Sequence, residues 1–158
     1  MLELKKLDKE ILLALIENGR EPVYKIARGV GASRQTVAKK INDFISRGLI
    51  ESFTVRLNPA MFDLNLKAYI LIDIEPKKEL RKRCGERIKR LHQITQFHYL
   101  FGRYDALAEA WAKDGEELTE LIKTIHELEG VRETETFIVH DTIKNSPQSP
   151  FIGILKTR

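Results

Sequence analysis

The spacing of apolar residues changes character near residue 58, and this change constrains the fold more than any other feature of the chain. Before that point apolar residues recur every three or four positions, as they do in helices with one buried face. After it, helical segments alternate with runs rich in β-branched residues. We therefore predict an α+β protein with a helical domain over residues 1–59, a linker over 60–65 and a mixed domain over 66–144.

Glycine, proline and serine residues divide the first domain into three short helices. The first helix is expected from about Leu4 to Ile16. Pro22 suits the start of the second helix, because a first-turn residue needs no N–H donor. The Ser33 hydroxyl can cap the third helix, which is expected to end near Gly48. Such short helices, joined by tight turns, indicate a compact helical unit.

Three residues in the second and third helices have the spacing of a helix-turn-helix. Ala27 permits close helix approach, Gly31 supplies the turn, and Val37 buries the inner face of the third helix. A helical hairpin with no role in DNA binding could share this spacing. The segment Leu49–Leu57 then alternates in character and predicts a short strand or wing. Together these features predict a winged helix-turn-helix.

The outer face of the third helix favours DNA binding. If Val37, Ile41, Phe44 and Ile45 face inward, a rotation of about 100° per residue gathers polar side chains on the opposite side. These side chains are Gln35, Thr36, Lys39, Asn42, Asp43 and Ser46. A merely solvated face could have the same composition, but with the motif and the wing it predicts contact with DNA.

Amide and cationic groups near the start of this helix suit base edges, and charges on its flanks suit phosphates. The candidate DNA-contacting residues are Ser33, Arg34, Gln35, Thr36, Lys39, Lys40 and Arg47. Of these, Lys40 and Arg47 are predicted to contact phosphates. Replacing Lys40 should then weaken binding to all DNA sequences alike.

The net charge is distributed unevenly. Residues 1–60 hold 11 Lys/Arg and 7 Asp/Glu, whereas residues 61–158 hold 16 of each. The positive excess therefore lies in the first domain, which favours a polyanionic partner for that domain. No apolar run is long enough for a membrane span, and no secretion signal is apparent at the start of the chain, so we expect a cytoplasmic protein.

The second domain is expected to have the order β-α-β-β-α-β, a ferredoxin-like sandwich with both helices on one face of an antiparallel sheet. The strands are expected over residues 67–74, 94–101, 106–112 and 132–139, and the helices over 78–92 and 116–128. In the tail, residues 145–158, Pro147 and Pro150 discourage regular structure. Its apolar residues nevertheless predict packing on the second domain or on a neighbouring subunit.

In their order and spacing, these motifs resemble the Lrp/AsnC family, the feast/famine regulators of bacteria and archaea. The matching motifs are Leu7-Asp8, Gly19-Arg20, Ile26-Ala27, Arg47-Gly48-Leu49-Ile50, Gly102-x-Tyr104-Asp105, Gly130-Val131 and Thr134-x-Thr136. The resemblance covers nearly everything from Leu7 to about Lys144. It implies a winged helix-turn-helix followed by an ACT/RAM-type domain that binds an effector and forms oligomers.

The resemblance further implies homodimers formed through the sheets, in some members assembled into octamers, with an amino acid or related small molecule bound between dimers. Carried over by position, the effector-binding residues are Gly102, Tyr104, Asp105, Thr134 and Thr136. Arg103 departs from the family pattern and suggests a ligand with an extra acidic group. An ordinary hairpin turn would also account for Gly102 and Asp105.

Other candidate sites carry less weight. Cys84 has no second thiol to pair with and is expected to be a small, partly buried residue, and the four histidines lack metal-ligand spacing. No phosphate loop, nucleophile elbow or paired carboxylate motif occurs, so we predict no metal, no cofactor and no catalytic residue. The basic segment 77–90 could contact DNA wrapped around an oligomer, could be solvated, or could pair with the acidic segment 114–129.

The sequence therefore predicts a sequence-specific transcriptional regulator that acts as a dimer or larger assembly, with double-stranded DNA as its partner and an amino acid as a candidate effector. The alternative is an architectural, chromatin-like DNA-binding protein with little sequence preference. A metabolic enzyme with an amino-acid-sensing domain is disfavoured, because the first 60 residues offer no catalytic constellation.

Overall fold

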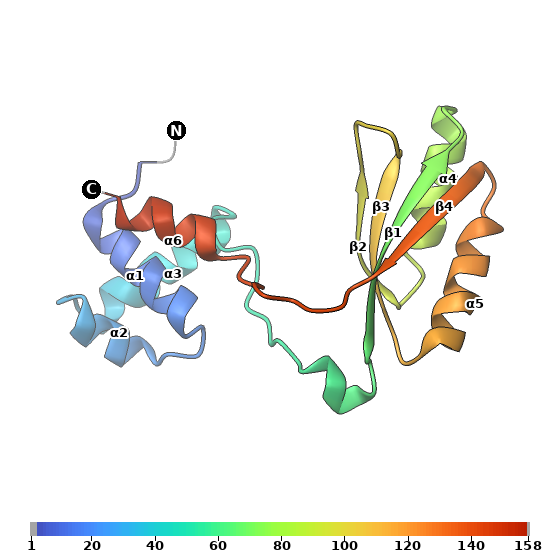
Figure 1. The fold of residues 1–158 in the computed structure, drawn as a ribbon. Coiled ribbons are helices and arrows are strands. Elements are labelled where there is room, and N and C mark those ends of the chain that lie inside the picture. The colour runs from blue at the N-terminus through green and yellow to red at the C-terminus, as the bar shows by residue number, and fades with distance from the viewer. Residues whose placement is uncertain (1–2, 158) are drawn as a thin grey trace. The chain divides into compact units, whose positions relative to one another are not determined.

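A computed structural model describes residues 3–157, which form two compact units (Figure 1). The first unit extends to Arg56 and also includes the segment from Lys144 onward, and the second unit spans Leu57–Ile143. The helices of the first unit are α1 (Lys6–Glu17), α2 (Val23–Gly29), α3 (Arg34–Ser46) and α6 (Ser149–Lys156). Within residues 3–157, no helix has the length and apolar character that a membrane span requires.

The three predicted helices of the first unit are present, and the predicted residues position them. Ile11, Val37 and Phe44 are almost completely buried where α1 and α3 pack together. Gly31 and Gly48 have left-handed φ angles of 67° and 70°, which glycine adopts without strain. These two residues turn the chain before and after α3, so local sequence sets the helix-turn-helix geometry.

Ile45 does not face inward as the sequence analysis predicted. It is 46% exposed, whereas its neighbour Phe44 is 1% exposed. Successive helical residues point about 100° apart, and at the end of α3 Phe44 points into the core while Ile45 points away from it. The buried stripe of α3 is therefore narrower than the apolar stripe in its sequence.

The predicted wing strand is not formed. Residues 51–58, all of them described, have no strand, and the side chains of Phe53, Val55 and Leu57 are exposed. A strand needs a hydrogen-bonded partner, and the single chain supplies none for this segment. Leu49 and Ile50, just before it, pack against the helical core of the first unit. Residues 51–58 therefore have no regular secondary structure, and those up to Arg56 still belong to the first unit.

The tail forms a helix, α6, and not the irregular segment that its prolines suggested. Pro150 lies in the first turn of α6, where a missing N–H has no cost. Leu155 is buried in the core of the first unit, and Lys9 Nζ donates to Thr157 O at 2.9 Å. The tail is thus part of the first unit, whereas the sequence analysis placed it on the second domain or a neighbouring subunit.

The second unit has the predicted ferredoxin-like order. Its elements are η1 (Pro59–Phe62), β1 (Leu66–Ile74), α4 (Lys78–Ile88), β2 (Ile94–Tyr99), β3 (Ala106–Ala112), α5 (Gly115–His126) and β4 (Val131–Ile138). The antiparallel sheet has the strand order β2-β3-β1-β4, and α4 and α5 cover one of its faces (Figure 1). The expected linker is partly structured, because the 3-10 helix η1 overlaps its first residues.

The helix-facing side of the sheet combines large and small residues. Ile70 and Ile72 of β1 are fully buried and pair in register with Ala108 and Ala106 of β3. The small alanines leave room for the helices, and Cys84 of α4 is completely buried here, more so than predicted. The opposite side of the sheet is called the open face below, and its residues include Lys67, Tyr69, Leu71, Leu107, Glu109, Trp111, Glu135 and Phe137.

Candidate nucleic-acid interface and effector region

Helix α3 begins with a satisfied cap. Ser33 Oγ accepts the Thr36 N–H at 3.1 Å and lies 2.8 Å from Thr36 Oγ1. The cap satisfies one of the N–H groups that the first turn of a helix leaves without a partner. Ser33 and Thr36 therefore fix where α3 starts, and Arg34 and Gln35 stand exposed between them.

The outer face of α3 carries polar side chains that have no polar partner among the described residues. Gln35 and Lys39 are exposed, and neither forms a side-chain hydrogen bond or ion pair with any part of residues 3–157. Arg34 lies over the aromatic ring of Tyr24 from α2, with its Cζ 5.6 Å from the ring centroid. Sequence reasoning missed Tyr24, because this contact depends on how α2 crosses α3.

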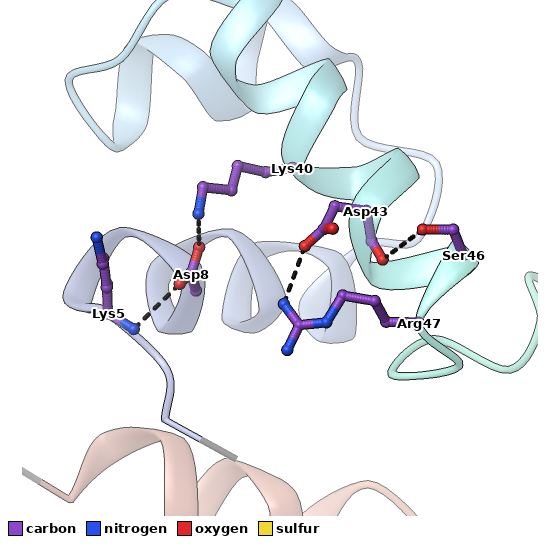
Figure 2. A network of polar contacts seen from close by, with 6 residues as sticks. All are labelled: Lys5, Asp8, Lys40, Asp43, Ser46 and Arg47. Carbon is purple, nitrogen blue, oxygen red and sulfur yellow. Dashed lines mark hydrogen bonds and ion pairs between the residues drawn. The ribbon is translucent and has the colours of Figure 1, made fainter.

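Lys40 was expected to be an unpaired lysine at the side of α3, available to a phosphate, but its environment is different. Its Nζ lies 2.7 Å from Oδ1 of Asp8 on α1, and Asp8 is 5% exposed (Figure 2). Asp8 Oδ2 also accepts the Lys5 N–H at 3.0 Å. Burial alone would raise the pKa of Asp8, but the Lys40 ammonium and the Lys5 N–H outweigh it and hold that pKa below its ordinary value. Lys40 therefore ties α3 to α1.

Arg47 remains accessible at the end of α3. Its Nη1 donates to Asp43 Oδ2 at 3.0 Å, and Ser46 Oγ donates to the Asp43 backbone oxygen at 3.0 Å (Figure 2). The Arg47 and Asp43 side chains are 50% and 46% exposed, so water competes strongly for this ion pair. The exposed Arg47–Asp43 pair is therefore held less firmly than the Lys40–Asp8 pair, whose carboxylate is nearly buried.

The predicted effector residues fall into two groups on different sides of β4. In the first group, Tyr104 donates to the Glu135 carboxylate, and Arg103 Cζ lies 5.3 Å from the centroid of the Tyr104 ring. The hydrogen bond to Glu135 raises the pKa of the Tyr104 hydroxyl. Glu135 pairs in register with Leu71 and belongs to the open face.

The second group lies on the opposite, helix-facing side. Thr134 and Thr136 pair in register with Ile72 and Ile70, which face the helices. Thr134 Oγ1 lies 2.8 Å from His126 Nε2 of α5, a partner that the sequence analysis did not identify. Because strand residues alternate between faces, one chain does not bring Thr134 and Thr136 together with the Tyr104 hydroxyl.

Asp105 and Gly102 belong to the turn before β3. Asp105 Oδ2 accepts the Ile74 N–H at 2.9 Å, and Oδ1 lies 3.8 Å from the Arg81 guanidinium. The Ile74 N–H is the main cause that holds the pKa of Asp105 below its ordinary value, with smaller contributions from Asp73 and Arg81. The Asp105 carboxylate is thus already used to join the turn to β1. Gly102 is exposed, and a Cβ added there would meet no atom within 4 Å.

Comparisons with known proteins identify the family to which this chain belongs. The AsnC-type helix-turn-helix domain matches residues 4–43, and the Lrp/AsnC ligand binding domain matches residues 67–149. An uncharacterized HTH-type transcriptional regulator of Pyrococcus abyssi is 32% identical over 143 residues, which cover 89% of this chain and 95% of that relative. The chain belongs to the Lrp/AsnC family of transcriptional regulators. The HTH-type transcriptional regulator LrpA of Pyrococcus horikoshii is 29% identical over 138 residues, covering 87% and 96%.

Solved structures of similar proteins share the whole fold of this Lrp/AsnC chain. A transcriptional regulator of Neisseria meningitidis, in complex with L-Met, has a TM-score of 0.91 at 23% identity and covers 96% of this chain and 99% of its own. A feast or famine regulatory protein from M. tuberculosis, complexed with L-methionine, has a TM-score of 0.84 at 20% identity, with coverages of 92% and 98%. These structures confirm the predicted α+β fold, and the family models and the 32% identical relative confirm the predicted family.

Proposed function

We propose that this Lrp/AsnC regulator places α3 in the major groove and recognises a specific base sequence there. The observation that carries the proposal is the outer face of α3, where Arg34, Gln35 and Lys39 are exposed and form no ion pair within the described residues. Guanidinium and amide groups can each make two hydrogen bonds to a base edge. In a helix-turn-helix, the N-terminal residues of this helix are the ones that reach the bases.

Phosphate contacts complete the proposed interface. Arg47 supplies a cation at one end of α3, and the capped start at Ser33 and Thr36 offers the positive end of the helix dipole. Lys40 acts indirectly, because its ion pair with Asp8 holds α3 on α1. The positive excess of residues 1–60 makes binding weaken as salt concentration rises.

We also propose a homodimer formed through the open face of the sheet. Leu71, Leu107 and Trp111 are only partly covered there, and Phe137 is 49% exposed. A second sheet laid on these side chains would remove apolar surface from water. A two-fold dimer carries two copies of α3, so its half-sites should lie about one turn of DNA, roughly 10 bp, or a multiple of that, apart.

The proposed effector is an amino acid, the class of ligand found in the two L-methionine complexes of similar fold. Tyr104 and Thr134 lie on opposite sides of β4, so we place the ligand where two subunits meet and each supplies one group. Exposed Arg103 favours a ligand with a second carboxylate. Calorimetry should therefore show aspartate or glutamate binding more tightly than methionine, and tighter binding of neutral amino acids would contradict this choice.

Selection of bound DNA from a random pool, with and without amino acids, tests the proposal on the full chain. We expect a pseudo-palindromic consensus with half-sites spaced as above. The double variant Arg34→Ala/Gln35→Ala should lose the consensus while its circular dichroism stays unchanged. A pool without a consensus would favour the architectural alternative. The proposal places the protein with DNA in the cytoplasm and assigns it no catalytic reaction, since the family consists of transcriptional regulators.

A further inference from the structure

Tyr24 is a large aromatic residue that lies outside the core of the first unit. It is the second residue of α2 and is 50% exposed. The inward side of α2 is formed by Val23, Ile26 and Ala27, which pack into that core. Successive helical residues point about 100° apart, so Tyr24 lies at the edge of the inward side and not within it. The ring is therefore available for a contact outside the core.

The ring makes this contact with the first residue of α3. The Arg34 guanidinium lies over the Tyr24 ring, with its Cζ 5.6 Å from the ring centroid. A cation within about 6 Å of a ring centroid is attracted by the electrons of the ring. Arg34 is exposed and forms no ion pair within residues 3–157. The ring therefore favours one placement of a side chain that no carboxylate holds in the described part of the chain.

The turn between α2 and α3 sets the relative position of the two residues. Gly31 has a left-handed φ of 67°, and the Ala32 N–H donates to the Ala27 backbone oxygen at 3.0 Å. The Ser33 cap then fixes the first turn of α3, which begins with Arg34. Backbone geometry thus brings the aromatic ring to the start of α3, whatever the two side chains contribute.

The contact leaves the hydrogen-bonding groups of Arg34 available. A cation–π attraction acts between the charge and the ring, and it uses none of the guanidinium N–H donors. An arginine side chain loses much conformational entropy when it is fixed. A side chain that is already held over a ring loses less on binding, so a ligand that hydrogen-bonds to Arg34 is bound more tightly.

We propose that Tyr24 is a positioning residue for sequence recognition, which holds Arg34 in place to read a G·C base pair in the major groove. The inference rests on the proposed function, in which the start of α3 reaches the bases. Guanine presents two acceptors on its major-groove edge, and one guanidinium can donate to both. A side chain held near one orientation meets this two-point requirement at a lower entropic cost than one that rotates freely. Tyr24 thus acts on specificity through Arg34, without a contact of its own to a base.

A direct contact of the Tyr24 hydroxyl with DNA is the main competing explanation. Tyr24 is half exposed, and its hydroxyl forms no hydrogen bond with the described residues, so it could donate to a phosphate. A phosphate contact carries no sequence information, whereas a ring that positions Arg34 affects one base pair. Removing the hydroxyl and removing the ring therefore have different consequences under the two explanations.

The test uses the full chain and the DNA site selected from the random pool. Arg34→Ala first identifies the base pair that Arg34 reads, as the position at which the preference for guanine is lost. Tyr24→Leu should then weaken binding to the selected site about two- to fivefold, the strength of a cation–π contact at an exposed position. The preference at that base pair should fall, and binding to unrelated DNA should not change. Tyr24→Phe keeps the ring and should bind like the wild type.

Two further variants separate positioning from other effects. In the Arg34→Ala background, Tyr24→Leu should cause no additional loss, because the side chain through which it acts is absent. Phe151→Leu on α6 removes a ring of similar exposure, 55%, from the same unit and should change neither affinity nor base preference.

Nuclear magnetic resonance tests the contact without DNA and without the leucine variant. The ring current of an aromatic side chain shifts the proton signals of groups that lie over it. The Arg34 side-chain signals should be shifted in the wild type and in Tyr24→Phe alike. Unshifted Arg34 signals in both proteins would show that the ring does not hold this side chain.

The binding measurements can also overturn the inference. If Tyr24→Phe binds as weakly as Tyr24→Leu, the hydroxyl is responsible. If Tyr24→Leu weakens both DNAs equally, or weakens binding further in the Arg34→Ala background, Tyr24 contacts DNA directly. Wild-type binding by Tyr24→Leu would mean that Arg34 needs no positioning. A random pool with no guanine preference that depends on Arg34 is a different result, because it contradicts the proposed function and the inference with it.

Discussion

The outer face of α3 and the open face of the sheet both carry charged side chains, but these charges are arranged in opposite ways. On the open face, Lys67 Nζ lies 2.8 Å from Glu109 Oε2, and the two side chains are 13% and 14% exposed. Thr95 donates to the same carboxylate at 2.9 Å. On α3, Gln35 and Lys39 extend into solvent with no such partner in the described chain.

The pKa directions reflect the difference. Burial would raise the pKa of Glu109, but the Lys67 ammonium and the Thr95 hydroxyl hold it below its ordinary value. Burial would likewise lower the pKa of Lys67, yet Glu109 raises it. The Lys67–Glu109 pair is therefore satisfied within one chain, as a place in the proposed dimer interface would require. The polar side chains on the outer face of α3 remain hydrated, so they are free to form and break hydrogen bonds with DNA.

The largest expected effect is a loss of stability when the Lys67–Glu109 ion pair is broken. Glu109→Ala leaves the Lys67 ammonium nearly buried without its counter-charge, so we expect the free energy of unfolding of the second unit to fall by about 3 kcal/mol. Urea unfolding followed by the fluorescence of Trp111, the single tryptophan, measures this. Replacing both partners, as Lys67→Met/Glu109→Leu, should cost less than about 1 kcal/mol. An equal loss in both variants would show that the charges are not coupled.

The next effect separates Lys40 from Lys39. Lys40→Met leaves the buried Asp8 carboxylate with the Lys5 N–H as its remaining contact, so the first unit should lose about 2 kcal/mol of stability. Lys39→Met is the matched control, because Lys39 is exposed and has no partner in the described residues. It should leave the melting temperature unchanged and weaken DNA binding. Direct phosphate contact by Lys40 would be supported if Lys40→Met lowered affinity with no loss of stability.

The same ion pair predicts a dependence on pH. The pKa of Asp8 in the folded chain lies below its ordinary value of 3.8, so the pair stabilises the first unit fully above that pH. Its contribution should disappear as the pH falls below 3.8 and through the lowered value, because the folded state must then take up the proton. Thermal unfolding of the wild type should therefore weaken more steeply in this range than that of Asp8→Asn. Parallel curves would contradict the assignment.

Base recognition by Gln35 should produce a selective effect. Gln35→Ala is expected to weaken binding to the selected DNA site about tenfold, since an amide that bonds a base edge contributes about 1 to 3 kcal/mol. Binding to unrelated DNA should not change. Electrophoretic mobility shifts on both DNAs measure the ratio, and Lys6→Met on α1 serves as the control. A uniform loss on both DNAs would place Gln35 on the phosphate backbone.

The smallest effect is expected at the end of α3. Arg47→Ala breaks an exposed ion pair with Asp43 and should change stability by less than about 0.5 kcal/mol. Its effect should appear in the salt dependence of DNA binding, with a slope reduced by about one. A loss of stability as large as that of Lys40→Met would remove the distinction between the two cations.

The local features of the first unit were predictable from sequence. Gly31 and Ser33 act through the backbone of their own turn, so their effect does not depend on distant residues. The polar side of α3 was also predicted correctly, because helical periodicity alone decides which residues share a face. Residues 102–105, predicted to bind the effector, lie in the expected turn, but the separation of Tyr104 from Thr134 across β4 was not foreseen.

The differences between expectation and structure share one cause. The ion pair of Lys40 was not foreseen because its partner, Asp8, lies 32 positions away in the sequence, and pairing at that distance is set by helix packing. The wing was assigned as a strand because composition cannot show whether a second strand is present. The tail was judged irregular from Pro147 and Pro150, although a proline in a first turn is harmless once the helix has a surface to pack on.

By itself, the sequence determined where the chain turns, which helical face stays polar and in which order strands and helices follow, since each depends on residues within a few positions of one another. Only the tertiary structure decided which polar side chains form hydrogen bonds or ion pairs within the protein and which remain available to a ligand. That division depends on distances between residues remote in sequence, and burial makes an unpaired charge costly enough to enforce it.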